Sequence, residues 1–458
     1  MINYSFNALD YAGLTVLLVL IILWVRSRRL QGLPLPPGPR GYPVIGNLLD
    51  MPTASPGQQL AKMGWDLKTD IVYLNVAGSH VISLNSYEAC TELLEKRSKT
   101  YSSRPHLPML IDLMGWEGDF LMQPYGERWK VRRKLFHHEF PVKDGKRHYS
   151  QQLKANRVLL KNLLDDPQEY REHVHHMSGS LILFVTYGID AQDRHNHHVV
   201  NADKAVVAFT TALSPGAFKV DLLPWLKYVP SWLPGAGFKR KAREWRHAYD
   251  EMGREAYDFT LDAMRRGEAV PSFVSNLEAK LTTGKSSWFK QKEVFDTAAT
   301  MYETGSDTTF TGLLTFILAM TCFPDSQKKA QAELDSVIGQ HRIPESDDWD
   351  KARYELPYCE AIMQEVLRAI FHDEKMYPDP YTFKPDRWIK DGKINPDVRD
   401  AMAAFGFGRR VCPGKHFALL TTFITITTVL AIFDIEKAVG EDGNVIEPTM
   451  EFVDTLQQ

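Results

Sequence analysis

The sequence predicts a mainly α fold with a small β part. Two observations support this prediction. First, 44% of the 458 residues are hydrophobic, which is enough for a large core. Second, helical patterns dominate the chain from about residue 119 onward, including long runs at 292–320 and 417–433, whereas β-rich runs are short and confined to 71–84. The sequence shows no internal repeat and no low-complexity segment.

The N-terminus is predicted to be a membrane anchor, residues 1–30. Residues 11–25 carry no charge and are followed by Arg26-Ser27-Arg28-Arg29. Basic residues after an apolar run place the remainder of the chain in the cytoplasm, whereas a cleaved signal peptide carries its charge before the run. The run is shorter than the ~20 residues of a full span, and a buried core helix is the alternative. A proline-rich hinge, 31–46, then leads into a single domain, 31–458.

Two further segments have clear local patterns. The runs 71–76 and 80–84 are rich in β-branched residues and flank Ala77-Gly78-Ser79, which predicts a hairpin. Residues 221–237 contain Pro224, Pro230 and Pro234, so this segment is not one helix.

The predicted helix 292–320 has an unusual centre, Thr304-Gly305-Ser306-Asp307-Thr308-Thr309. Glycine and threonine are poor helix formers. Thr308 is expected to turn its hydroxyl back to the carbonyl of Thr304 and to bend the helix. Asp307 beside Thr308 supplies an acid and a hydroxyl that can pass protons. The alternative is a strained but inert helix.

The most informative stretch is residues 405–414, in which three glycines surround Cys412. A thiol at the start of a helix beside Arg409 and Arg410 is expected to ionise, and the thiolate is the form that binds metal. The four cysteines show no paired spacing, so neither a disulfide framework nor a zinc site is predicted. One thiolate can be the protein ligand of a haem iron, and the alternative is a buried, inert cysteine.

This stretch resembles the haem-binding loop of the cytochrome P-450 monooxygenases, Phe-x-x-Gly-x-Arg-x-Cys-x-Gly. The pattern is met by Phe405, Gly408, Arg410, Cys412 and Gly414. The resemblance implies a haem domain in which Cys412 ligates iron and thiolate donation favours cleavage of the O–O bond.

The resemblance also gives roles to residues outside the loop. Trp129 and Arg133 lie four residues apart on one helix face and, with Arg410, match residues that hold haem propionates in the family. The alternative for this pair is a core tryptophan beside a solvated arginine. Asp307 and Thr308 match the acid and alcohol of the family's oxygen-activating motif. Thr304 departs from that motif, which has a small residue there.

A third set of matches has a structural role. Glu365 and Arg368 lie three residues apart, and Arg387 follows in a Phe-x-Pro-x-Arg loop, so the three match the family's scaffold triad. The family has a long stretch of strands between these motifs. Here Ala369 leads almost directly into the loop, which implies a reduced sheet. The C-terminus also stops early, so a shortened splice form or a faulty gene model would explain both differences.

The implied function is a haem b-dependent monooxygenase that acts on a hydrophobic small molecule, with electrons from NADPH through a membrane-bound reductase. A basic docking face for the reductase is expected at Lys130, Arg132, Arg409 and Lys415. The overall pattern is similar to fungal secondary-metabolite members, which implies a single-pass protein of the endoplasmic reticulum membrane. A net charge of −3 gives no indication of nucleic acid binding. The alternative function is a non-catalytic or unstable haem-binding product, because the strands are missing.

Overall fold

The computed structural model describes residues 34–52, 55–141, 147–193, 196–214, 216–345, 347–349, 355–369 and 376–449, together with residues 15, 18, 19, 22 and 373. The predicted anchor therefore falls almost entirely outside the described residues, and so does the C-terminal stretch 450–458. The chain divides into two compact units, Met1–Ser98 with Pro215–Leu226, and Lys99–Ser214 with Lys227–Gln458. Each unit is considered by itself.

The smaller unit is built on the predicted hairpin. Strands β1 (Ile71–Val76) and β2 (Ser79–Leu84) pair antiparallel, with Ile71 opposite Leu84. Alternate residues of β1 face inward, and its three valine and leucine side chains are at most 2% exposed. They pack against leucine and methionine side chains of α2 (Pro56–Leu67). The unit also contains the short helices α3 (Tyr87–Cys90) and α9 (Lys219–Leu222). The hairpin prediction is confirmed.

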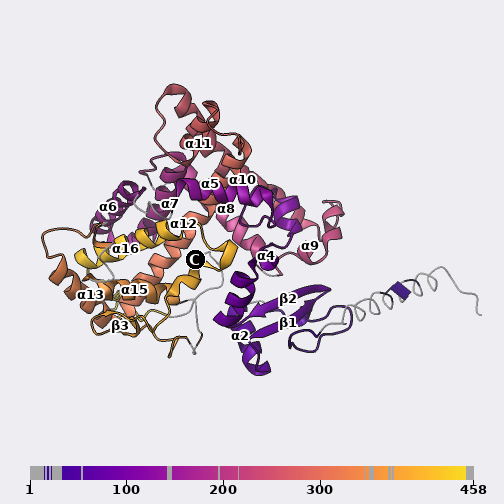
Figure 1. Ribbon diagram of the computed structural model, residues 1–458, viewed down its shortest axis with the longest axis horizontal. Helices are drawn as coiled ribbons and strands as arrows, with labels where there is room; N and C mark the ends of the chain where they lie inside the picture. The colour runs from indigo at the N-terminus through magenta and orange to yellow at the C-terminus, as the bar shows by residue number, and fades with distance from the viewer. Residues whose placement is uncertain are drawn as a thin grey trace, which may run out of the picture. The chain divides into compact units, whose positions relative to one another are not determined.

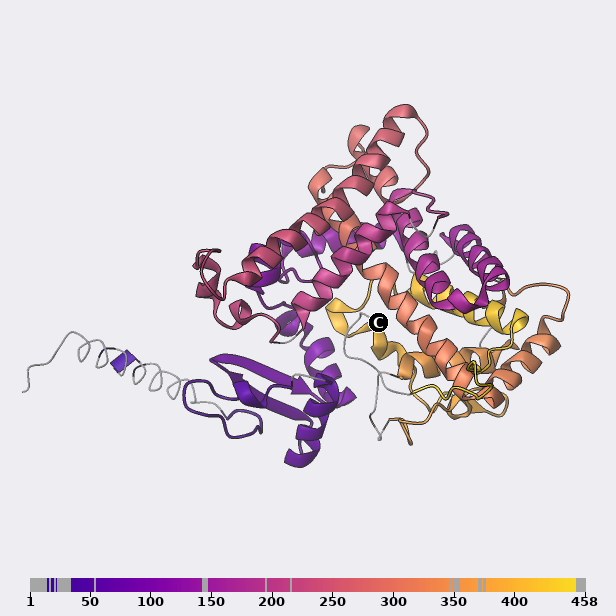
Figure 2. The same cartoon turned by 180° about the vertical axis from the view of Figure 1, so that it is seen from behind.

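The larger unit is mainly helical (Figure 1 and Figure 2). Its helices are α5 (Glu127–Glu139), α6 (Tyr149–Asp165), α7 (Tyr170–Tyr187), α8 (His197–Leu213), α10 (Gly237–Arg266), α11 (Phe273–Thr282), α12 (Gln291–Cys322), α13 (Pro324–Val337), α15 (Pro357–Arg368) and α16 (Lys415–Ile432). The short helix α4 (Ser98–Tyr101) begins at the last residue of the range Met1–Ser98, and its other residues belong to the larger unit. Strands β3 (Ile389–Lys390) and β4 (Lys393–Ile394) form a second small hairpin.

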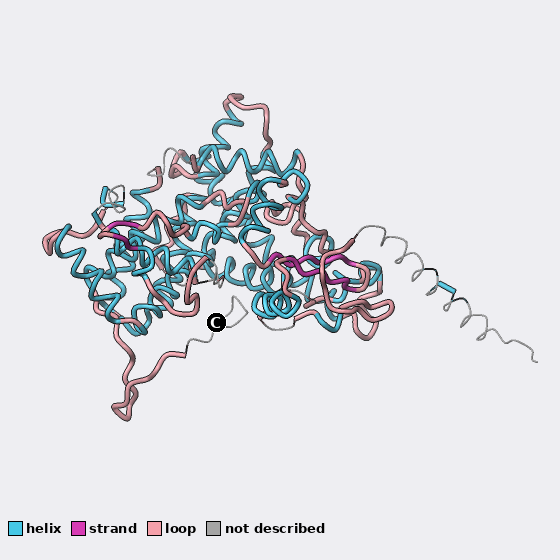
Figure 3. The backbone as a smooth tube through the Cα atoms, turned by 60° about the horizontal axis from the view of Figure 1, so that its bottom comes forward, coloured by secondary structure: helices cyan, strands magenta, loops and turns pink. Residues whose placement is uncertain are grey.

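Strands are few throughout the described residues (Figure 3). Both sheets there have two strands, β1 with β2 and β3 with β4. The prediction of a mainly α fold with a reduced sheet is confirmed. Between α9 and α10 the chain forms a short helical turn at Pro224–Tyr228, so residues 221–237 are not one helix, as predicted.

Helix α12 is the element around which the larger unit packs. It spans 32 residues and contacts α5, α7, α8, α10, α11, α15 and α16. Gly305 allows a close approach to α7, because a Cβ at this position would lie 2.7 Å from Cγ1 of Ile182. The prediction of one long helix is confirmed. The glycine at its centre serves the contact with α7.

Helix α16 has the length and composition of a membrane span but is mostly buried in the larger unit. Among the described residues, α16 is the one helix that could cross a membrane by these criteria, or one of two if α12 and α13, bent by 105°, count as a broken span. Burial by neighbouring protein explains its apolar sequence, because a helix that is apolar on all sides is typical of a core.

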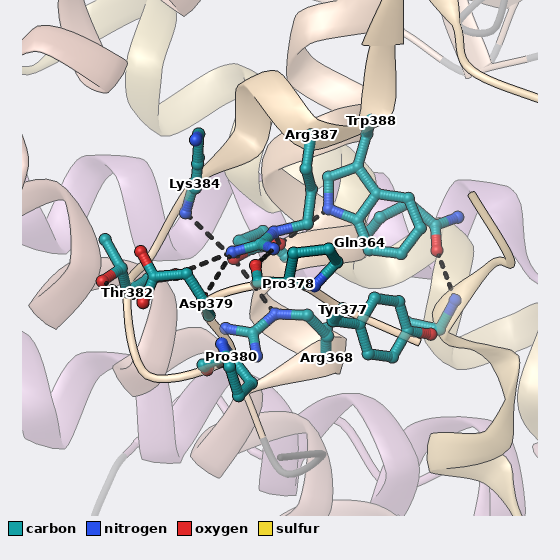
Figure 4. Close-up of polar contacts among 12 residues, drawn as sticks. Gln364, Arg368, Tyr377, Pro378, Asp379, Pro380, Thr382, Lys384, Arg387 and Trp388 are labelled. Atoms are coloured by element: carbon teal, nitrogen blue, oxygen red, sulfur yellow. Dashed lines mark hydrogen bonds and ion pairs between the residues drawn. The ribbon is translucent and has the colours of Figure 1, made fainter. Parts of the chain in front are cut away.

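The predicted triad of Glu365, Arg368 and Arg387 is assembled on α15, which packs against α12. Figure 4 shows its two arginines. The carboxylate of Glu365 lies 3.0 Å from Nε of Arg368 and 3.1 Å from Nε of Arg387. It also accepts hydrogen bonds from the indole of Trp388 at 2.7 Å and the backbone N–H of Lys384 at 2.9 Å. The three charged side chains are at most 7% exposed. The alternative of an exposed helix pair is therefore wrong.

The two arginines of the triad also hold the loop that follows the short connection. Arg368 donates to the carbonyl of Pro380 at 2.6 Å, and Arg387 donates to the carbonyls of Asp379 and Thr382 at 3.0 Å each (Figure 4). The short link between α15 and this loop thus still permits the triad to close. Buried charges of this kind need such complete pairing to be tolerated.

Candidate functional site

The cysteine loop is folded back on itself just before α16. The backbone N–H of Cys412 donates to the carbonyl of Phe405 at 2.7 Å. Gly406 and Gly408 have φ values of 79° and 56°, a region that favours glycine over other residues. A Cβ at Gly414 would be 3.9 Å from Sγ of Cys412, so the thiol lies over the first turn of α16. The glycines therefore shape the loop that presents the thiol.

The surroundings of this thiol oppose the ionisation expected from the sequence. Burial raises the pKa of Cys412, although the backbone N–H of Gly414 and the charges of Arg133 and Lys415 act to lower it. One of the two arginines next to it in sequence points elsewhere, because Arg409 donates to the Tyr125 hydroxyl at 2.6 Å. A bound cation at the sulfur would offset this cost, because metal coordination deprotonates a thiol.

Arg410 reaches away from the loop into a ring of backbone carbonyls. Its guanidinium donates to the carbonyl of Ser102 at 2.7 Å and of Gln123 at 2.5 Å. It also lies over the ring of Trp129, 4.7 Å from the centroid. Burial, followed by repulsion from Arg104 and Arg133, lowers the pKa of Arg410 to about 10.

Three guanidinium groups thus lie near one another at this site, those of Arg104, Arg133 and Arg410. Arg133 is 6.0 Å from the centroid of Trp129, which is itself 6% exposed. Asp119 is the acidic group whose charge acts to raise the pKa of Arg410 and of Arg104. Crowded, partly desolvated cations are stabilised by an anionic partner. The two carboxylates of a haem fit this cluster, and the nearby thiol fits its iron.

The structure adds Arg104 to the residues chosen from the sequence. It donates to the carbonyl of Leu121 at 3.2 Å, and burial lowers its pKa. No helical or strand periodicity marks this position, since Arg104 lies in the irregular segment before the turn at 109–113. Only the folding of this segment against the cysteine loop brings it to Arg410.

On α12, Thr308 lies as expected. Its hydroxyl donates to the carbonyl of Thr304 at 3.1 Å, and its side chain is exposed. Thr304 makes the same contact to Thr300 at 2.7 Å. Asp307 is half-buried, and burial raises its pKa. Among the described residues its Oδ2 atom is buried without a hydrogen-bond partner.

Glu303 is almost completely buried. Only 2% of this residue is exposed, and neither carboxylate oxygen has a hydrogen-bond partner among the described residues. Burial, followed by the nearby charge of Asp119, raises its pKa well above the usual range. Asp119 is also fully buried, and its pKa is raised to about 6. Burial thus raises the pKa of both neighbouring carboxyl groups, that of Glu303 more than that of Asp119.

One residue of the expected docking face, Arg132, is buried, so this part of the prediction is wrong. Arg132 is 0% exposed and forms an ion pair with Asp296 of α12, so it cannot contribute to a surface. The period of α5 explains the error, because Arg132 follows the buried Trp129 by three residues and shares its face. Lys130 pairs with Glu127 at 2.6 Å on the exposed side of α5.

Comparisons with known proteins agree with this geometry. The family model for cytochrome P450 matches residues 36–371 and 369–456, in two segments that meet where the sequence analysis placed the missing strands. A cytochrome P450 monooxygenase of Armillaria gallica is 38% identical over 96% of this chain and 93% of its own length. A cytochrome P450 monooxygenase of Postia placenta is 36% identical over 97% and 91%.

A further relative carries a more specific name. It is a tryptamine 4-monooxygenase of Psilocybe cyanescens, 36% identical over 94% of this chain and 93% of its own length. All three relatives are fungal monooxygenases, and the agreement extends over nearly the whole chain. This chain belongs to the cytochrome P450 family and is a haem-dependent monooxygenase of the fungal type.

Proposed function

We propose that this protein inserts one oxygen atom from O₂ into a hydrophobic small molecule, with electrons from NADPH delivered by a partner reductase. Each turnover reduces the second oxygen atom to water and consumes NADPH and a proton. The observation that carries the proposal is the cluster of Arg104, Arg133 and Arg410, whose charges repel, in the same unit as the thiol of Cys412.

In this proposal the cysteine loop and the guanidinium cluster bind the same molecule of haem b. Cys412 is the iron ligand, and Phe405, Gly408 and Gly414 shape the loop that presents it. Trp129, Arg133 and Arg410 hold the propionates, with Arg104 added from the structure. When bound, the haem iron supplies the activation of dioxygen.

Asp307 and Thr308 supply protons at the same site. The carboxyl of Asp307 holds a proton more readily than an exposed acid because burial raises its pKa. The exposed hydroxyl of Thr308 presents a donor one residue further along α12. Its bond to the carbonyl of Thr304 fixes the direction of that hydroxyl.

The cellular setting follows from the N-terminal sequence. Residues 1–30 anchor the protein in the endoplasmic reticulum membrane with a single span, and the hinge at 31–46 joins the anchor to a cytoplasmic domain, 31–458. A membrane-bound reductase docks through basic groups, for which the exposed Lys130 and Arg409 and the half-buried Lys415 remain after the exclusion of Arg132. The products belong to fungal secondary metabolism.

The central test is the spectrum of the reduced, carbon monoxide-bound protein with Cys412 changed to serine. Wild type should show the red-shifted absorption that thiolate ligation causes, and Cys412→Ser should lose it. Cys322→Ser is the matched control, because it removes another partly buried thiol and should keep the band. A band that persists in Cys412→Ser would contradict the assignment of the ligand.

The alternative is a non-catalytic or unstable haem-binding product, and it is motivated by the small number of strands among the described residues. A second measurement separates the two proposals. The catalytic proposal expects NADPH-driven oxygen consumption when the haem-loaded protein is mixed with a fungal cytochrome P450 reductase. Full haem occupancy without any oxygen consumption above the reductase alone would favour the non-catalytic alternative.

A further inference from the structure

Asp307 lies near charged side chains of two other helices. It belongs to α12, and the packing of α7 and α8 against this helix places His175 and Asp203 near its carboxyl group. The buried Oδ2 atom of Asp307 has no hydrogen-bond partner among the described residues. A buried carboxyl oxygen without a partner needs an explanation, since such groups are normally satisfied.

His175 is held between this carboxyl and the solvent. Its Nε2 atom is 3.2 Å from Oδ1 of Asp203, and the two side chains are 24% and 41% exposed. The edge of its ring contacts Phe310 of α12 at a centroid distance of 5.0 Å. Phe310 follows Asp307 by three residues and so lies on the same side of the helix. The chain of titratable groups therefore leads from the exposed Asp203 through His175 toward α12.

The charges around the imidazole come from all three helices. A hydrogen bond to Asp203 raises the pKa of His175 most, and Glu172 of α7, Asp203 of α8 and Asp307 of α12 add attraction, while burial opposes them. In return the charge of His175 lowers the pKa of Asp307, which burial and Asp203 raise.

Two other basic groups of α7 lie nearby. The guanidinium of Arg171 lies over the same Phe310 ring that His175 contacts, 5.6 Å from its centroid. The His176 ring nitrogen Nε2 lies 2.9 Å from the carbonyl of Ala191. His175 is thus the imidazole that faces the acidic groups. Imidazole is the side chain that exchanges protons near neutral pH, and its two nitrogens allow a proton to enter at one and leave at the other.

We propose that His175, oriented by Asp203, is the inlet through which protons from solvent reach Asp307. A proton moves from water to the imidazole and then from the imidazolium to the carboxylate of Asp307, so only N–H and O–H bonds form and break. Neither His175 nor Asp203 touches the reacting atoms, and both are positioning residues that act through Asp307. The inference rests on the proposed function, in which Asp307 and Thr308 supply protons.

A purely structural role is the competing explanation. The pair of His175 and Asp203 also joins α7 to α8, and a tie of this kind contributes to stability alone. The two explanations differ in what pH does. If the pair is only structural, its removal changes the melting temperature and leaves the pH profile of the reaction unchanged. If His175 is an inlet, the reaction rate depends on the protonation of His175, and its removal changes the pH profile.

The test uses the haem-loaded protein with reductase and measures NADPH-driven oxygen consumption, which needs protons even without added substrate. The variants are His175→Gln, Asp203→Asn and Asp307→Asn, assayed between about pH 5.5 and 8.5, the range in which imidazole titrates, in H₂O and D₂O. His247→Gln is the matched control, because its exposed imidazole on α10 has its Nε2 atom 3.1 Å from a carboxylate of the same helix.

We expect His175→Gln to lower the rate about tenfold, to remove the inflection due to the imidazole and to enlarge the solvent isotope effect. His247→Gln should match wild type. A wild-type pH profile and isotope effect in His175→Gln, alongside a lowered rate in Asp307→Asn, would overturn the inlet while leaving the proposed function intact. Wild-type behaviour of Asp307→Asn would instead contradict the proposed role of Asp307.

A second readout does not depend on turnover. NMR of protein labelled with ¹³C at the histidine ring, assigned with His175→Gln, reports the pKa of His175 directly. Asp203→Asn should lower this pKa, because the substitution removes the hydrogen bond and the charge that raise it. A pKa of His175 that is the same in wild type and Asp203→Asn would also overturn the proposal.

Discussion

Two buried glutamates of the larger unit differ in whether their carboxylate oxygens have partners. Glu365 on α15 is 0% exposed, and its oxygens contact Arg368, Arg387 and an indole N–H. Glu303 on α12 is 2% exposed, and its oxygens have no hydrogen-bond partner among the described residues. Pairing offsets the cost of burying a charge, whereas burial without pairing raises the pKa of Glu303 well above its usual range.

The difference separates a scaffold from a site. The paired glutamate joins α15 to the loop that holds Arg387. Both oxygens of Glu303 and Oδ2 of Asp307, four residues apart on α12, are buried without hydrogen-bond partners among the described residues. Unsatisfied polar groups cost stability, so their concentration at one stretch of α12 points to function.

The largest effect is expected at the paired glutamate. Glu365→Ala leaves the guanidinium groups of Arg368 and Arg387 buried without their counter-charge, so the free energy of unfolding should fall by about 3–5 kcal/mol. Urea denaturation followed by circular dichroism measures it. Glu127→Ala is the control, since that side chain is 85% exposed in its pair with Lys130 and should change stability by at most about 1 kcal/mol. Similar losses in both variants would remove the distinction.

A smaller effect is expected where α12 touches α7. Gly305→Ala places a Cβ 2.7 Å from Cγ1 of Ile182, and the overpacking should lower the free energy of unfolding by about 1–3 kcal/mol. Gly312→Ala is the matched control on the same helix, because nothing lies within 4 Å of its Cβ position. That change should stabilise the protein by about 0.5–1 kcal/mol. Stabilisation by both changes would show that α7 has room to move.

Glu303, the glutamate without a partner, should make the free energy of unfolding depend on pH. Unfolded Glu303 loses its proton near its ordinary pKa of 4.5, whereas burial keeps the folded form protonated at higher pH. Folding therefore binds a proton, and the stability that this group contributes is present at low pH and is lost as the pH rises. The slope is at most about 1.4 kcal/mol per pH unit. Glu303→Gln should flatten the curve of unfolding free energy against pH. Parallel curves for the two proteins would mean that Glu303 is ionised in the fold.

The smallest effect on stability is expected at Thr308, whose side chain is exposed. Thr308→Ala should change the free energy of unfolding by about 0.5 kcal/mol or less, because such substitutions rarely matter at exposed positions. Its effect should be chemical. Less of the NADPH consumed should yield water or product, and more should appear as hydrogen peroxide, measured by a peroxidase-linked assay. Unchanged peroxide yield would leave Thr308 with a helix-shaping role only.

The sequence by itself determined the elements and most of the candidate site. Helical and β periodicities located α12 and the hairpin of β1 and β2, and the spacing of Phe405, Gly408, Arg410, Cys412 and Gly414 identified the cysteine loop. These features are local, because a glycine turn or a helix face depends on neighbours within a few residues. The triad could also be predicted, since its members lie in recognisable motifs.

Only the tertiary structure decided the burial and the charged neighbours of the side chains at the candidate site. Arg104 joins Arg410 only through the folding of an irregular segment, Arg132 turns inward to Asp296, and Cys412 is buried enough to raise its pKa. His175 and Asp203 reach Asp307 from two other helices. Desolvation and charge–charge interactions depend on distance in space, and contacts between residues far apart in sequence leave no periodic signal.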